Sequence, residues 1–390
     1  MWWLTLGALA APITTDEVVG AALQNSVDLA TAQAEVERAG GVRQASGGFR
    51  ENPELQVGVG LDGSRLQGQL TQPVSVTGEG GHARRAASAQ LSAAEQRLRR
   101  VQLEVGANAR SLLTRLSEAE ASVAIAEQQL DGANRLREVA EARLAAGDVP
   151  ELDAQLARLE QSRAVATWID AGQHATALRV ELAGMTGMTE AFEVADDPLS
   201  ASPPSSETEP VRSDVAAAES SVAGARAALS QERAAGLAPL ELGGFYELDQ
   251  GSWVVGPMTT VMLPLWKQNP SGRAAALADL AVADATLAAT RTQSQVQLLV
   301  AGPNLAIAQR GEALLTGTVT DDAVKALAAL QQGYKLGQVD LTTTLLLQDR
   351  VFEGKRGWYS ARRAVAELRI EVALTREDPS LLPENWTPTP

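Results

Sequence analysis

Hydrophobic and polar residues alternate strictly in the segment that follows Pro53. The apolar positions are Leu55, Val57, Val59 and Leu61, and between them lie Gln56, Gly58, Gly60 and Asp62. A period of two over eight residues predicts a β-strand with one apolar face. Residues 62–64 (Asp-Gly-Ser) predict a turn, and a second alternating run follows with Leu66, Gly68 and Leu70. We therefore expect a β-hairpin in this segment.

A second alternating segment follows Pro239. Its apolar positions are Leu240, Leu242, Tyr246 and Leu248 and, after a turn at residues 249–252, Trp253, Val255, Val261 and Leu263. Strands of about ten residues with one apolar face are typical of transmembrane barrels. A hairpin in a soluble protein has the same pattern, so alternation alone leaves both interpretations open. In a membrane, we expect Tyr246 and Trp253 to lie at the lipid–water interface.

Long helices fill most of the remaining chain. From Ala86 to about Ala145 small and apolar residues recur at every seventh position: Leu91, Leu98, Val105, Leu112, Ala119, Ala126, Ala133 and Ala140. A heptad repeat of this length predicts a left-handed coiled coil, here about 60 residues or roughly 90 Å long. The last helix carries two neighbouring stripes, one of Leu345, Phe352, Tyr359, Ala366 and Ala373 and one of Val351, Trp358, Val365 and Val372. Two stripes allow one helix to contact neighbours on both sides.

Capping residues and helix breakers give the other helix boundaries. The patterns predict helices over 14–50, with Thr15 or Asp16 as N-cap and an end at Gly47-Gly48, and over 150–187, 212–236 and 341–378. We expect Gly302-Pro303 to kink or break the second long helix, because proline cannot donate the helical hydrogen bond.

The two halves of the chain resemble each other. Asp28 and Pro53 recur as Asp214 and Pro239 at the same offset, and Gly147 recurs as Gly337 at nearly that offset. A duplicated unit of this kind gives both halves of the chain the same fold. We expect a signal peptide at 1–11, a first repeat at 12–195, a Pro/Ser-rich linker at 196–211, a second repeat at 212–378 and a tail at 379–390.

Composition narrows the possible classes of protein. Aromatic residues make up only 4% of the 390 residues, which favours closely packed helices over a large globular core. The net charge of −15 disfavours nucleic acid as a partner. The chain has no cysteine, so disulfides and thiolate metal sites are excluded. Ala8-Leu9-Ala10 after a short apolar stretch resembles the end of a secretory signal.

No pattern in the sequence predicts an enzyme or a cofactor site. Residues 78–83 (GEGGHA) fit a dinucleotide-binding fingerprint, but a long coiled coil follows instead of a βαβ unit. His82 and His174 are too few and too far apart for a metal site. No serine or carboxylate pair stands in a catalytic setting. We therefore expect no cofactor, no metal and no catalytic residue.

Together these features resemble the TolC family of bacterial outer-membrane efflux channels. The resemblance rests on AALQNSVDLATAQAEVERA near the start, the junctions at Pro53 and Pro239, LPLWKQNPSGRAAA from Leu263 and GYKLGQVDLTTTLLLQDR from Gly333. It implies a mainly α fold with a small β part. In that family three chains each lend four strands to a twelve-stranded transmembrane β-barrel, and their helical hairpins form an α-barrel, a tunnel in the periplasm. It also implies a homotrimer in outer-membrane lipid that works passively with a periplasmic adaptor and an inner-membrane pump to export small molecules or metal ions.

The resemblance also suggests functional positions. The tips that would dock the adaptor map to Gly147, Asp148, Val149, Gly337, Gln338 and Val339. The pore aperture, which carries aspartates in drug exporters, maps to Thr343 and Leu346, with Asp340 and Asp349 as the nearest carboxylates. The polar strand face would give an acidic lumen through Gln56, Asp62, Glu241 and Glu247.

Two other functions fit the sequence less well. A periplasmic adaptor would show one helical hairpin beside several soluble β modules, whereas this sequence predicts two hairpins and four strands. A structural coiled-coil protein leaves the alternating strands without a role.

Overall fold

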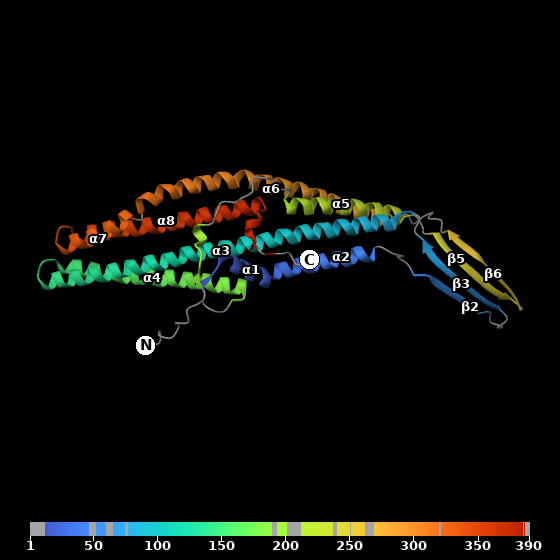
Figure 1. Cartoon of the computed structure of the whole chain (residues 1–390), viewed down its shortest axis with the longest axis horizontal. Coiled ribbons are helices and arrows are strands. Elements are labelled where there is room, and N and C mark those ends of the chain that lie inside the picture. Colours follow the sequence, from blue (N-terminus) through green and yellow to red (C-terminus); the bar gives the residue numbers. More distant parts are fainter. Residues whose placement is uncertain are drawn as a thin grey trace. The chain divides into compact units, whose positions relative to one another are not determined.

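The computed structural model describes residues 12–46, 52–59, 65–74, 77–188, 193–200, 212–236, 240–249, 251–261, 269–319, 321–384 and 386. The fold is mainly α with a small β part, as the sequence predicts (Figure 1). Two compact units emerge from the contacts. The tip unit comprises Met1–Val27, Gln102–Pro210 and Val296–Pro390, and the sheet unit comprises Asp28–Val101 and Val211–Gln295.

The four expected strands form one antiparallel sheet in the sheet unit. Its order is β2 (Glu54–Val59), β3 (Arg65–Val74), β5 (Leu240–Asp249) and β6 (Ser252–Val261). The register pairs Leu55 of β2 with Leu70 of β3, Leu66 of β3 with Leu248 of β5, and Leu248 with Trp253 of β6. Because side chains alternate between faces, all the described apolar positions named from the sequence share one face, and the predicted amphipathic strands are confirmed.

The sheet's apolar face is solvent-exposed in the single chain. Leu55, Val57 and Val59 of β2 and Val255 and Val261 of β6 are all exposed. Strands β2 and β6 are the two edges and, within the described residues, each pairs along one side only. A chain that exposes an apolar sheet with two open edges needs partners for both features.

Two long helices run through both units. Helix α3 (Glu79–Ala145) and helix α6 (Pro270–Val319) each follow a hairpin of the sheet. On α3 none of the eight heptad residues is exposed, and the six from Val105 to Ala140 are buried. None of the nine stripe residues on α8 (Leu341–Thr375) is exposed either. The heptad interpretation is confirmed.

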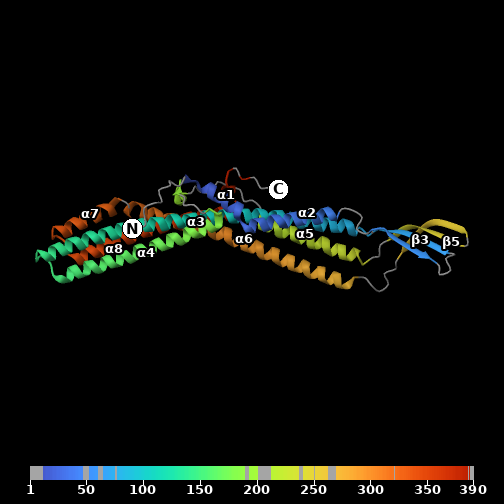
Figure 2. The ribbon, with the colours of Figure 1, turned by 90° about the horizontal axis from the view of Figure 1, so that it is seen from below.

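The other helices of the tip unit lie beside α3. They are α1 (Thr15–Asn25), α4 (Glu151–Thr186), α7 (Asp321–Lys335) and α8 (Figures 1 and 2). An apolar cluster joins α1, α3 and α4: Val18, Leu112, Leu113, Leu116, Ala119, Ala175, Leu178 and Leu182. Two very short strands, β1 (Pro12–Ile13) and β4 (Glu193–Val194), pair in parallel, and the short 3-10 helices η1 (Pro198–Ser200) and η2 (Pro379–Leu381) complete the unit. The sheet unit adds α2 (Val27–Ala45) and α5 (Ser213–Ala234).

The structure corrects the N-terminal helix. The expected single helix is two, α1 and α2, because Ser26 adopts an extended backbone (φ −74°, ψ 120°) between them. The N-cap is Thr14 rather than Thr15 or Asp16. Thr14 and Glu17 form a capping box in which each side chain accepts the other's backbone N–H.

Proline 303 does not end helix α6, which continues to Val319. The carbonyl that Pro303 leaves without a helical donor belongs to Leu299, which is 74% exposed. Water can satisfy that group, so the cost of the proline is small here. The described α7 begins at Asp321.

Several predicted features lie outside the described residues. These are the turn at residues 62–64, Leu61 and Leu263, the end at Gly47-Gly48, the signal segment 1–11 and most of the 196–211 linker. No helix among the described residues is both long enough and apolar enough to cross a membrane.

Candidate functional site

The two helical hairpins of the tip unit turn with the same backbone geometry. At the first tip Gly147 N–H donates to the Leu144 carbonyl (2.9 Å) and Asp148 N–H to the Arg143 carbonyl (2.9 Å). At the second, the Gly337 and Gln338 N–H groups donate to the Tyr334 and Gly333 carbonyls, at 3.0 and 2.8 Å. Both glycines have positive φ (80° and 71°). This is a Schellman motif, which explains why glycine is favoured at each tip.

The six tip residues named from the sequence lie where expected, at the helix ends. Gly147 and Asp148, like Gly337 and Gln338, are exposed, and Val149 and Val339 are half-buried. Each tip therefore presents one turn glycine and one polar side chain to solvent.

Arg143 joins the two tips. Its Nη1 donates to the Tyr334 carbonyl at 3.0 Å, and its Cζ lies 5.2 Å from the centre of the Tyr334 ring. The ring is 1% exposed and packs with Leu136, Ala140, Ala157 and Leu341. Burial and the nearby Asp153 carboxylate raise the pKa of the Tyr334 hydroxyl, so it stays neutral. The sequence reasoning missed this contact, although a lone tyrosine just before a tip glycine was a usable signal.

Of the four candidate aperture residues, Asp340 and Thr343 form a helix cap. The Asp340 carboxylate accepts from Thr343 N–H at 2.9 Å and from the Thr343 hydroxyl at 2.7 Å, at the start of α8. These hydrogen bonds hold the pKa of Asp340 below its ordinary value. The carboxylate is therefore charged at neutral pH but turned toward its own helix.

The other two candidates differ from each other. Leu346 is an exposed apolar side chain, 57% accessible. Asp349 is paired with Arg163 of α4, whose Nη1 lies 2.8 Å from its Oδ2. The four residues thus do not converge in one chain, and their role at an aperture stays a prediction.

The sheet carries the remaining candidates. Trp253 (70% exposed) and Tyr246 both lie on the apolar face, and the Tyr246 ring packs over Gly68. On the opposite face Gln67 Nε2 donates to Glu247 Oε1 at 3.0 Å, and Glu241 and Gln56 share that face by register. One face of the sheet is apolar and the other is polar and acidic.

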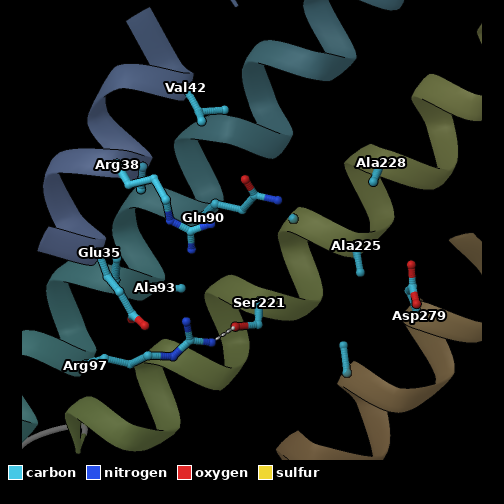
Figure 3. A pocket seen from close by; sticks show the side chains of 14 residues that line it. Glu35, Arg38, Val42, Gln90, Ala93, Arg97, Ser221, Ala225, Ala228 and Asp279 are labelled. Carbon is cyan, nitrogen blue, oxygen red and sulfur yellow. Dashed lines mark hydrogen bonds between the residues drawn. The ribbon is translucent and has the colours of Figure 1, made fainter. Parts of the chain in front are cut away.

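A hollow of about 450 Å³ lies among α2, α3, α5 and α6 in the sheet unit (Figure 3). Its lining includes small residues and four charged ones, Glu35, Arg38, Arg97 and Asp279. Arg97 extends to Ser221 and donates to its hydroxyl at 3.1 Å. Two positive and two negative groups in the lining give no preference for the sign of a solute.

Comparison with known proteins agrees with this geometry. The family model "Outer membrane efflux protein" matches residues 18–188. No curated protein matches the sequence.

Solved structures share the fold over almost the whole chain. A membrane protein from Pseudomonas aeruginosa is 18% identical with a TM-score of 0.78 over 94% of this chain and 91% of its own. The outer membrane protein VceC of Vibrio cholerae is 17% identical with a TM-score of 0.73 (93% and 96%). The CmeC outer membrane channel of Campylobacter jejuni is 14% identical with a TM-score of 0.75 (93% and 85%). The first part of the chain is thus similar to outer membrane efflux proteins, and nearly the whole chain shares the fold of solved outer membrane channels.

Proposed function

We propose that the chain is one third of a passive exit channel in the bacterial outer membrane, with its helical tunnel in the periplasm. The observation that carries the proposal is the sheet: its outer face is apolar and exposed, and both its edge strands lack a neighbour within the described chain. A second and a third copy would pair those edges and place the apolar faces against lipid. Three four-stranded sheets would supply twelve strands.

The two tips support a docking role. They are built alike, expose the same kind of residue and are tied together by Arg143. We infer that Gly147, Asp148, Val149, Gly337, Gln338 and Val339 contact a periplasmic adaptor, and that an inner-membrane pump supplies the energy. The cargo would be small molecules or metal ions. The repeated order of helix, two strands and long helix supports the duplicated organisation inferred from the sequence.

The decisive experiment is single-channel conductance of the purified protein in planar bilayers, with chemical cross-linking to count subunits. We expect stable conductance steps and a cross-linked trimer. A monodisperse monomer with no conductance would contradict the proposal.

The tip assignment needs its own test. Gly147→Trp or Gly337→Trp should abolish export in cells while trimers remain in the membrane. Gly147→Ala is the matched control, because it shares the strained positive φ without the bulk and should retain export. Normal export in both tryptophan variants would show that the adaptor docks elsewhere.

A further inference from the structure

The core between the two hairpins of the tip unit is polar at one level. Gln129 of α3 and Gln348 of α8 are only 3% and 5% exposed, and Ala126 and Ala133 lie on either side of this level along α3. The side chain of Glu160 on α4 is 14% exposed. We name this level the polar layer, and its members are Gln129, Gly132, Glu160, Arg163, Gln348 and Asp349.

Close packing holds the polar layer in place. A methyl group on Gly132 would lie 2.6 Å from Gln348 Nε2, so the Gln348 amide packs directly against this glycine. Gln129 Oε1 accepts a hydrogen bond from Arg356 Nη1 of α8 at 3.2 Å. The first hairpin (α3 and α4) and the second (α7 and α8) are thus joined here by polar contacts, where the heptad pattern elsewhere places apolar ones.

One guanidinium group serves two carboxylates in the layer. Arg163 Nη1 lies 2.8 Å from Asp349 Oδ2 on the other hairpin and 3.6 Å from Glu160 Oε2 on its own helix. Arg163 is 61% exposed, so water weakens its bond with Asp349. A change of one charge beside a weak bond can decide whether that bond persists.

The surroundings of Glu160 favour its neutral form. Burial and the charge of Asp349 from α8 raise its pKa above the ordinary 4.5, while Arg163 on its own helix and the uncharged amide of Gln129 from α3 act in the opposite direction. Separating the hairpins would remove the Asp349 charge, which is one of the two causes that raise this pKa. Glu160 therefore binds a proton more tightly when the hairpins are joined. By linkage, protonation of Glu160 favours the joined arrangement.

We propose that the polar layer is a proton-sensitive latch between the two helical hairpins, with Glu160 as its sensor. Ionised Glu160 repels Asp349 and competes with it for Arg163. Neutral Glu160 does neither, so Arg163 then forms its ion pair with Asp349 alone. The latch tightens as pH falls through the pKa of Glu160 and loosens as pH rises above it. Its effect on transport rests on the proposed channel function, but the latch itself does not.

The test measures the distance between the hairpins directly. The chain has no cysteine, so Ser162→Cys on α4 and Leu347→Cys on α8, both at exposed positions, would carry the only two spin labels of each chain. Mixing labelled chains with an excess of unlabelled ones restricts the measured distance to a single chain of the proposed trimer. Electron–electron double resonance on the full-length protein should give a narrow, short distance distribution at about pH 5. At about pH 7.5 the distribution should shift to longer, broader values.

Three variants complete the experiment. Glu160→Gln, which mimics the protonated form, should give the narrow distribution at both pH values. Asp349→Asn, which removes the link, should give the broad one at both. Glu141→Gln is the matched control, because it removes an ion pair with Arg158 inside the first hairpin and should keep the wild-type response.

A Glu160→Gln protein that responds to pH like the wild type would overturn the proposal, as would a wild type that does not respond. Bilayer conductance measured on the same proteins separates the two claims. A pH-dependent distance between the hairpins without conductance would contradict the proposed channel function and would still support the latch.

Discussion

Gly106, in the middle of α3, makes room for the C-terminal segment. A Cβ atom there would lie 2.5 Å from the carbonyl oxygen of Leu381 and 3.3 Å from its carbonyl carbon. Because these atoms are backbone, they cannot move aside as a flexible side chain would. We predict that Gly106→Ala displaces η2 from α3.

The expected loss of stability can be worked from the contacts. Leu381 is 2% exposed and packs with Leu103, Ala107, Ile370 and Ala373. Exposing it costs about 1.5–3 kcal/mol, and losing the hydrogen bond from Arg110 Nε to its carbonyl (3.3 Å) costs about 1 kcal/mol more. Alanine returns about 1 kcal/mol of helix propensity. The net destabilisation is about 1.5–3 kcal/mol.

The assay compares two matched glycines. Gly172 is also inside a helix of the tip unit, but no described atom lies within 4 Å of its added Cβ, so Gly172→Ala should be neutral or slightly stabilising. Thermal unfolding in detergent and the rate of trypsin cleavage after Arg376 should distinguish the variants. If Gly106→Ala unfolds at the temperature of Gly172→Ala and is cleaved no faster than the wild type, the packing argument is refuted.

Three further predictions follow from other contacts. Val57→Arg on the apolar face of the sheet should prevent membrane assembly, at a cost of up to about 2–4 kcal/mol, whereas Gln56→Arg on the opposite face should be tolerated. The yield of heat-resistant trimers on gels measures assembly of both variants, and equal yields would contradict the assigned faces. Asp340→Ala should speed hydrogen exchange at the Thr343 amide, whereas Asp340→Ser should not. Because the pKa of Asp340 is lowered in the folded protein, the helix cap is fully formed above the unfolded pKa and is lost as pH falls through the folded pKa. A helix cap that is unchanged at low pH would count against the capping role of Asp340. Arg143→Ala should increase the open time in bilayer recordings more than Arg143→Lys if the guanidinium stack holds the tips together, and equal open times would exclude it.

The regular elements could be predicted from the sequence because each depends on a local period. The alternation at Leu55 and Leu240 required two strands with one apolar face, and the heptads from Leu91 to Ala140 required a long helix with one buried stripe. The helix over 150–187 was predicted to within a residue, because Gly147 ends the preceding helix and Pro150 begins the next one. Local propensity was a weaker guide: Ser26 interrupts a helix that its neighbours favour, and Pro303 does not break helix α6.

The candidate site was predictable only in part. The tip glycines follow from backbone geometry, since a left-handed turn at a helix end favours glycine. The roles of Asp340 and Asp349 do not follow from sequence, because a carboxylate can cap a helix, line a pore or pair with arginine at the same position in the chain. Contacts decided that Asp340 caps α8 and that Asp349 pairs with Arg163.

The sequence by itself therefore determined the fold class and the two hairpins, because periodicity and turn chemistry are local. Only the tertiary structure decided which helices share polar contacts. Arg143 reaches Tyr334, and Arg163 reaches Asp349, across more than a hundred residues of chain that no local pattern connects. Such contacts depend on how two helices are placed side by side, and that placement is set by packing across the whole tip unit.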